Sequence, residues 1–216
     1  MTRYFLNERE IAPPGDMSSF DQILKHVEKS HLPPDSVIRQ IQVDGHPLVP
    51  ESFVDPGEIL RQMESRDRIE IFTATVLEVA RDSVFEAIDY LERVETVTHS
   101  LASSFQISPG PESFQTLRQL LDGFYWLSLL LDKLAVNFKI ALESCSVQGA
   151  SAREHLGKFV GVLKQLIDAQ ERGDSTLISD LLEYEVIPTV PVWKDMFGLV
   201  LREMDKEKQD SRKPVK

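Results

Sequence analysis

The sequence is poor in cysteine and has no hydrophobic run of membrane-spanning length. A lone cysteine, Cys145, excludes an intramolecular disulfide and a thiolate metal cluster, since both need more than one thiol. A membrane helix needs about 20 apolar residues, whereas the most apolar stretch, 120–134, contains Asp122, Asp132 and Lys133. The first residues show no basic segment followed by an apolar one. We therefore expect no signal peptide, no membrane partner and a cytoplasmic location.

Basic residues are also scarce relative to acidic ones. The 216 residues include 24 Lys and Arg against 35 Asp and Glu, which gives a formal net charge of −11. The acidic excess is spread over both parts of the chain, so neither part is a hidden basic domain. Because an acidic surface repels phosphate backbones, we expect no nucleic acid among the partners.

Sequence patterns for catalysis and for cofactor or metal binding are missing. The glycines and serines form no nucleophile elbow, phosphate loop or dinucleotide fingerprint. Glu95 and His99 are spaced one residue too far for the Glu-x-x-His pair of di-iron proteins, and no second copy exists. One side of a predicted helix carries four acids, which we interpret as a solvated face: Glu78, Asp82, Glu86 and Asp89. We expect no catalytic residue, no cofactor and no metal.

Residues 1–73 predict a small α+β domain. Expected elements, in order, are strands at 3–6 and 9–12, a helix that Asp16 or Ser18 caps and Pro33-Pro34 stops, strands at 36–43 and 46–49, a short helix near 56–63 and a strand at 68–73. Asp44-Gly45 is a strong tight-turn signal between the third and fourth strands. We expect Val37, Ile41 and Val43 to share one strand face.

This order of elements, with the Asp44-Gly45 hairpin, resembles the β-grasp (ubiquitin-like) fold over about the first third of the chain. Ubiquitin binds partners through an exposed isoleucine before this hairpin, where this chain has Gln42. Ubiquitin and the sulfur carriers end in a free Gly-Gly tail, whereas here residues 73–75 lead into a helix. The resemblance therefore implies the fold and neither conjugation nor sulfur carriage.

From residue 75 onward the patterns are helical. Capping boxes at 75–78 and 151–154 mark helix starts, and breaks follow at 108–111, Gly173, Pro188 and Pro191. The second long helix is predicted to carry a heptad seam from Phe114 to Cys145 and to end at Gly149. We expect an antiparallel four- to five-helix bundle over 74–208 and a disordered tail over 209–216.

Three local features of this helical part lead to further expectations. Cys145 continues the apolar seam and is expected to be a buried structural thiol. Gly157 and Gly161 are expected to permit the close approach of a neighbouring helix. The region of Trp126 and the segment 180–188 are similar to patterns in uncharacterised bacterial helical-bundle proteins, a resemblance that implies no activity.

The candidate interaction residues lie in two regions. Tyr125 and Trp126 follow Phe124 of the seam, so they point about 100° and 200° away from it. Either other helices of the chain surround them, or they face another molecule. Acids around the kink before Pro188 form either a docking edge or an exposed face. The full candidate set is Tyr125, Trp126, Asp180, Glu183, Tyr184, Glu185 and Trp193.

These observations favour a non-enzymatic protein-interaction protein, an adaptor or a chaperone-like protein. Its expected partner is another protein or a second copy of itself in a homodimer. One alternative is a small-molecule sensor with a pocket inside the helical bundle. Another is an enzyme of unrecognised type that uses carboxylates or histidines in the cleft between the two domains.

Overall fold

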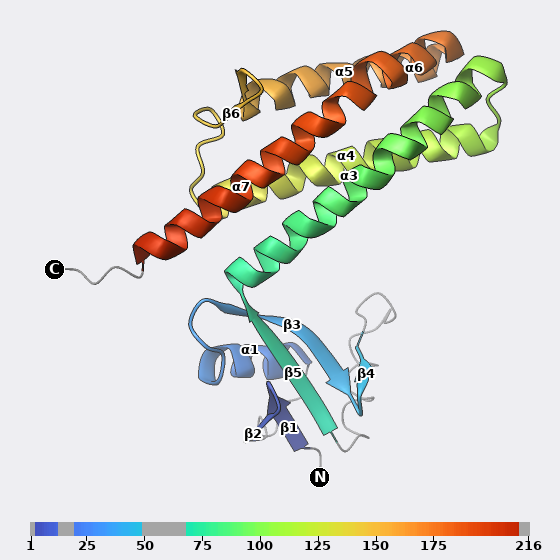
Figure 1. The fold of residues 1–216 in the computed structure, drawn as a ribbon. Helices are drawn as coiled ribbons and strands as arrows, with labels where there is room; N and C mark the ends of the chain where they lie inside the picture. The colour runs from blue at the N-terminus through green and yellow to red at the C-terminus, as the bar shows by residue number, and fades with distance from the viewer. Residues whose placement is uncertain (1–2, 13–19, 49–67, 212–216) are drawn as a thin grey trace. The chain divides into compact units, whose positions relative to one another are not determined.

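The computed structural model describes residues 3–12, 20–48 and 68–211 (Figure 1). The chain is α+β, with a small N-terminal sheet followed by long helices, and it divides into two compact units, 1–79 and 80–216. The expected helix at 56–63 and the expected caps Asp16 and Ser18 lie outside the described residues. So does most of the expected tail, although its residues 209–211 belong to the last helix rather than to a disordered segment.

The described residues of the N-terminal unit form a five-stranded sheet in the order β2-β1-β5-β3-β4. β1 pairs with β5 in parallel and with β2 in antiparallel, and β3 is antiparallel to β5 and β4. Val27 of the helix joins Ile41, Val43, Ile69 and Ile71 of the strands in one buried cluster. The elements are β1 (Arg3–Leu6), β2 (Arg9–Ile11), α1 (Phe20–Ser30), β3 (Ser36–Val43), β4 (His46–Pro47) and β5 (Arg68–Thr75).

A bulge in β3 overturns one expectation for this sheet. Its pairing with β5 shifts register between Ile38 and Gln40, so the alternation of side chains reverses at that point. Ile38 therefore packs against the buried cluster, while Val37 is exposed. The prediction that Val37 shares the buried face of Ile41 and Val43 is wrong, because it assumed an unbroken period of two.

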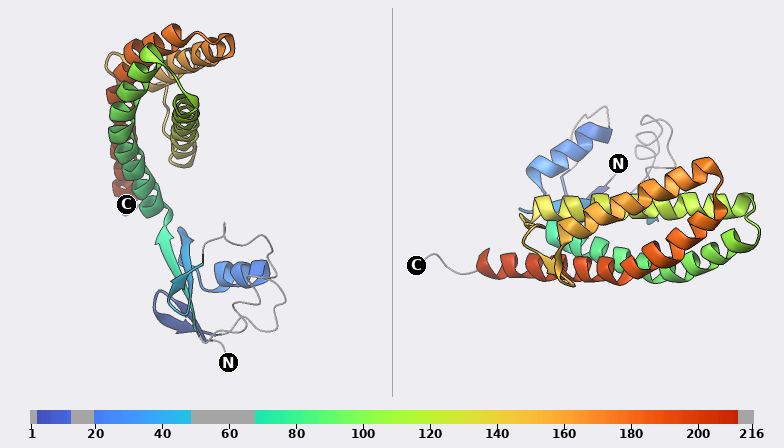
Figure 2. Two further views of the ribbon diagram at one scale, coloured as in Figure 1. Left: turned by 90° about the vertical axis from the view of Figure 1, so that its right-hand side faces the viewer. Right: turned by 90° about the horizontal axis from the view of Figure 1, so that it is seen from above.

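In the helical unit, α3, α4, α5 and α7 lie lengthwise beside one another, and consecutive members of this set run in opposite directions (Figures 1 and 2). Two other elements connect them, a short β6–β7 hairpin and a broken helical segment. The bounds are α3 (Val76–Ile107), α4 (Pro111–Asn137), β6 (Ser146–Val147), β7 (Ala150–Ser151), α5 (Ala152–Arg172), α6 (Ser175–Leu181) and α7 (Val190–Ser211).

The local signals for helix ends are confirmed where they were strongest. Glu78 accepts from the backbone N–H of Thr75, and Glu154 accepts from that of Ser151, so both capping boxes form. Gly173 ends α5 in the left-handed conformation. Pro188 lies in a 3-10 turn that follows a π-helical turn at Leu182–Val186, which confirms the predicted break between α6 and α7.

The helix α4 ends earlier than the heptad pattern predicted. Lys139 adopts a left-handed φ of 51°, and its N–H donates to the Val136 carbonyl. The N–H of Ile140 donates to the Ala135 carbonyl at 2.8 Å, which completes a Schellman motif. This motif satisfies the free carbonyls at the helix end without the usual glycine. Cys145 is consequently in the connection before β6 and does not continue the seam.

Aromatic rings from three helices form the centre of the helical unit. The Phe124 ring of α4 lies 4.5 Å from that of Phe159 in α5 and 5.9 Å from that of Trp193 in α7, measured between centroids. Phe159 and Trp193 also contact each other, edge to face at 5.5 Å. Trp193 is only 1% exposed. It is therefore a core residue of its own chain, and its selection as a candidate interaction residue is corrected.

The close helix approach occurs at Gly123 and not at the Gly157–Gly161 pair. A Cβ on Gly123 would collide with the ring and hydroxyl of Tyr90 in α3, so this side chain packs directly on the glycine and would have to shift for any larger residue. A Cβ on Gly157 or Gly161 would meet nothing within 4 Å. The expectation that these two glycines admit a neighbouring helix is therefore wrong within this chain.

These contrasting sites predict opposite effects of the same substitution. Gly123→Ala should destabilise the protein by about 1–3 kcal/mol, because the Tyr90 ring must move. Gly161→Ala, the matched control, should stabilise it by about 0.5–1 kcal/mol, because helical glycine costs backbone entropy and nothing blocks the methyl group. Urea unfolding monitored by circular dichroism measures both changes. Equal effects of the two substitutions would contradict the Tyr90–Gly123 contact.

Candidate functional site

The side of α4 opposite the aromatic core carries exposed apolar side chains. We call this row the α4 outer seam and define it as Asp122, Trp126, Leu129, Lys133 and Val136. Its spacings of four and three residues keep it on one face, and Trp126 and Leu129 lie about 200° and 140° around the helix from Phe124. Trp126 is 39% exposed, Leu129 41% and Val136 76%. α4 therefore presents apolar surface both inward and outward.

Tyr125 and Trp126 differ in how far their own chain covers them. Tyr125, beside the seam, is 64% exposed. Trp126 lies edge to face against Tyr90 of α3, with ring centroids 5.9 Å apart, and keeps its outer side open. Burial raises the pKa of the Tyr90 hydroxyl, an effect that Arg93 reduces and Asp122 increases. Tyr90 thus covers one side of Trp126 and leaves about two fifths of the residue exposed, so the chain's own helices enclose this pair only in part.

The acidic candidates lie on a different element, the broken segment between α6 and α7. Asp180, Tyr184 and Glu185 are exposed, and Glu183 is half-buried. In the π-helical turn Leu182–Val186, the side chains of Leu182 and Val186 are buried, whereas Tyr184 is 66% exposed. Glu185 borders a small recess of about 140 Å³ that also touches the Trp193 ring. This segment is an exposed acidic edge, separate in sequence and element from the outer seam.

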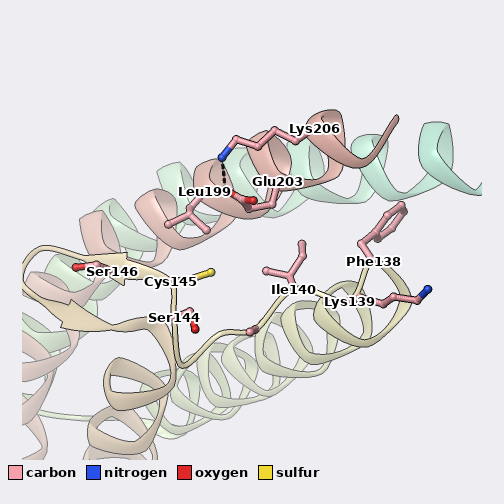
Figure 3. Close-up of a pocket in the computed structure, with 10 residues that line it drawn as sticks. Phe138, Lys139, Ile140, Ser144, Cys145, Ser146, Leu199, Glu203 and Lys206 are labelled. Carbon is pink, nitrogen blue, oxygen red and sulfur yellow. Dashed lines mark hydrogen bonds and ion pairs between the residues drawn. The ribbon is translucent and has the colours of Figure 1, made fainter. Parts of the chain in front are cut away.

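A larger recess, which the sequence did not reveal, lies between the α4–β6 connection and α7 (Figure 3). Its volume is about 810 Å³, and Phe138, Ile140, Cys145 and Leu199 are among its lining residues. The Glu203–Lys206 ion pair, at 2.7 Å, lies at its edge. No sequence signal pointed to it, because α4 was expected to continue as a helix through this connection.

Cys145 points its sulfur into this recess (Figure 3). Burial raises the pKa of its thiol, and the nearby carboxylates Glu203 and Glu143 raise it further, while Lys206 partly offsets them. The thiol is therefore protonated near neutral pH, whereas a nucleophilic cysteine needs a lowered pKa. Cys145 is half-buried rather than fully buried, a modest correction to the expected core thiol.

The histidines and carboxylates of the described residues do not gather into a metal site. No group of three or more His, Cys, Asp or Glu in these ranges is placed to hold a metal ion. Glu95 and His99 are both exposed on α3. His155 instead shares a 2.8 Å hydrogen bond with the Val147 carbonyl, which ties α5 to the β6–β7 hairpin. Nor does any helix in the described ranges have the length and apolar character to cross a membrane.

The environment of Cys145 predicts slow, pH-dependent alkylation. In the folded chain, the rate with iodoacetamide should rise with pH through a midpoint above the value of about 8.5 for a free cysteine. Glu203→Gln removes a negative charge, lowers the pKa of the thiol and should speed the reaction at pH 8. The urea-unfolded chain serves as the reference for an unperturbed thiol. Equal rates for folded and unfolded chains at pH 8 would contradict the assignment.

Comparison with known proteins identifies the helical unit by family. No curated protein and no solved structure is significantly similar to the chain. A family described as Domain of unknown function (DUF8042) matches residues 82–196, which is more than half of the 216 residues. The match contains Tyr90, the whole of α4 and the aromatic core of Phe124, Phe159 and Trp193. The chain belongs to the DUF8042 family.

Proposed function

We propose that this protein is a non-enzymatic protein-interaction module and that the α4 outer seam, together with Tyr125, is its docking surface. The observation that carries the proposal is the exposure of Tyr125, Trp126 and Leu129 on a helix whose other side already supplies the core. Aromatic side chains are enriched at the centres of protein interfaces and among the residues that dominate binding energy.

The energetics of these side chains support docking. Fully burying a large apolar side chain is worth about 1.5–3 kcal/mol relative to leaving it in water. Trp126 and Leu129 each retain about two fifths of their surface, so a partner recovers part of that energy. Tyr90 already holds the Trp126 ring from one side, which reduces the side-chain entropy lost on binding.

The architectural part of the proposal has support of its own. A β-grasp fold for the N-terminal unit is supported by the strand order β2-β1-β5-β3-β4 with β1 parallel to β5. An antiparallel helical bundle is supported by the alternating directions of α3, α4, α5 and α7 and by the aromatic contacts among the last three. A cytoplasmic location is supported by the absence of cysteine pairs in the sequence.

Site-specific photo-crosslinking tests the docking surface. A benzophenone amino acid in place of Leu129 should give covalent adducts with protein in a lysate of the native organism, because that side chain enters the interface. The same amino acid in place of Gln170, an exposed residue of α5, is the matched control and should give none. Adding Trp126→Glu should reduce the adduct at position 129. Equal yields at the two positions, or none at either, would refute the docking surface.

A further inference from the structure

We propose that the occupant of the α4 outer seam is a second copy of this chain, packed antiparallel across a two-fold axis so that Asp122 of each copy faces Lys133 of the other. This inference rests on the proposed function, since it names the partner of the same surface. It comes from the order of charges and apolar groups along the exposed face of α4.

The outer seam has the periodicity of a coiled-coil contact. Asp122, Trp126, Leu129, Lys133 and Val136 follow spacings of four, three, four and three residues, the pattern by which helices pack along a shared stripe. α4 already uses this pattern once, on the inner face that carries Phe124. The second seam lies on the opposite side, where Leu129 and Val136, with Tyr125 beside them, are exposed.

The charges decide the orientation of the second copy. A parallel pairing places each residue against its own counterpart, so Asp122 meets Asp122 and Lys133 meets Lys133, and both layers repel. An antiparallel pairing about an axis between Leu127 and Ser128 instead places Asp122 opposite Lys133 of the second copy. Two-fold symmetry repeats that pair, so two complementary contacts form. Only the antiparallel arrangement is complementary in charge.

The same register pairs the two apolar residues at the centre of the seam. It places Trp126 against Leu129 of the second copy, twice, in the two layers next to the axis. Each of these two residues is about two fifths exposed, whereas Val136, the third apolar residue of the seam, lies opposite Gln119 of the second copy. The Asp122–Lys133 pairs then lie one layer further out on either side. This gives an apolar centre with charged flanks, the arrangement typical of protein interfaces.

Asp122 and Lys133 are available for this pairing. Asp122 and Lys133 are exposed, and within the described ranges no ion pair joins either of them to another side chain. Exposed ion pairs contribute little affinity, so Trp126 and Leu129 supply most of the binding energy and the charges select register and orientation. Because one helix from each copy makes the contact, it falls below a standard-sized interface, and we expect a reversible dimer with a micromolar dissociation constant.

A charge swap tests the register in the full chain. Sedimentation equilibrium should show wild-type dimerisation, and Lys133→Glu should weaken it on the order of tenfold, because two attractions become two repulsions. The double variant Asp122→Lys/Lys133→Glu reverses both partners and should restore the wild-type dissociation constant to within a few-fold. Lys164→Glu makes the same charge change on an exposed position of α5 and should leave the dissociation constant unchanged.

Three results would each overturn the proposed dimer: a wild-type chain that stays monomeric at high micromolar concentration, a Lys133→Glu variant that dimerises like wild type, and a double variant that stays as weak as the single one. Circular dichroism melting of each variant establishes that it is folded.

The crosslink at position 129 separates the two proposals. An adduct with a different protein and none with the chain itself refutes the dimer and retains the docking surface, whereas no adduct refutes both.

Discussion

The contact of Phe124 with Phe159 and Trp193 is the interaction on which the helical unit depends. It joins α4, α5 and α7 through three rings within 6 Å of one another. It also fixes the rotation of α4 about its own axis. Because a helix turns 100° per residue, placing Phe124 inward places Trp126 and Leu129 outward. The core contact therefore determines which side chains α4 offers to solvent, and these include the apolar residues Trp126 and Leu129.

Two neighbours of α4 limit how much of that outward side the chain can cover. Tyr90 of α3 fits over Gly123 and reaches the edge of Trp126, but it leaves Tyr125 and Leu129 open. On the other flank, Arg153 of α5 reaches α4 only through an exposed ion pair with Asp132. A contiguous exposed apolar patch on a helix is typical of an interaction site.

Local signals in the sequence predicted helix starts and stops well, because capping boxes and proline breaks depend on neighbouring residues alone. The end of α4 was missed because Lys139 takes the left-handed position that glycine usually marks. Val37 was misplaced because a bulge depends on the partner strand. Trp193 was misassigned because composition does not distinguish a core aromatic from an interface aromatic. The outer seam could be placed only once the inward direction of α4 was known.

Trp193 lies in the core of the helical unit and Trp126 lies on the outer side of α4. Fluorine NMR of the full chain labelled with 5-fluorotryptophan therefore tests most directly whether a second copy covers Trp126. Single Trp→Phe substitutions assign the two resonances. We expect the Trp126 resonance to shift between low and high micromolar protein. We also expect it to change between H2O and D2O only in dilute protein, where the ring is in contact with solvent. The buried Trp193 resonance should show neither change. A Trp126 resonance that is independent of concentration and always solvent-accessible would contradict the account.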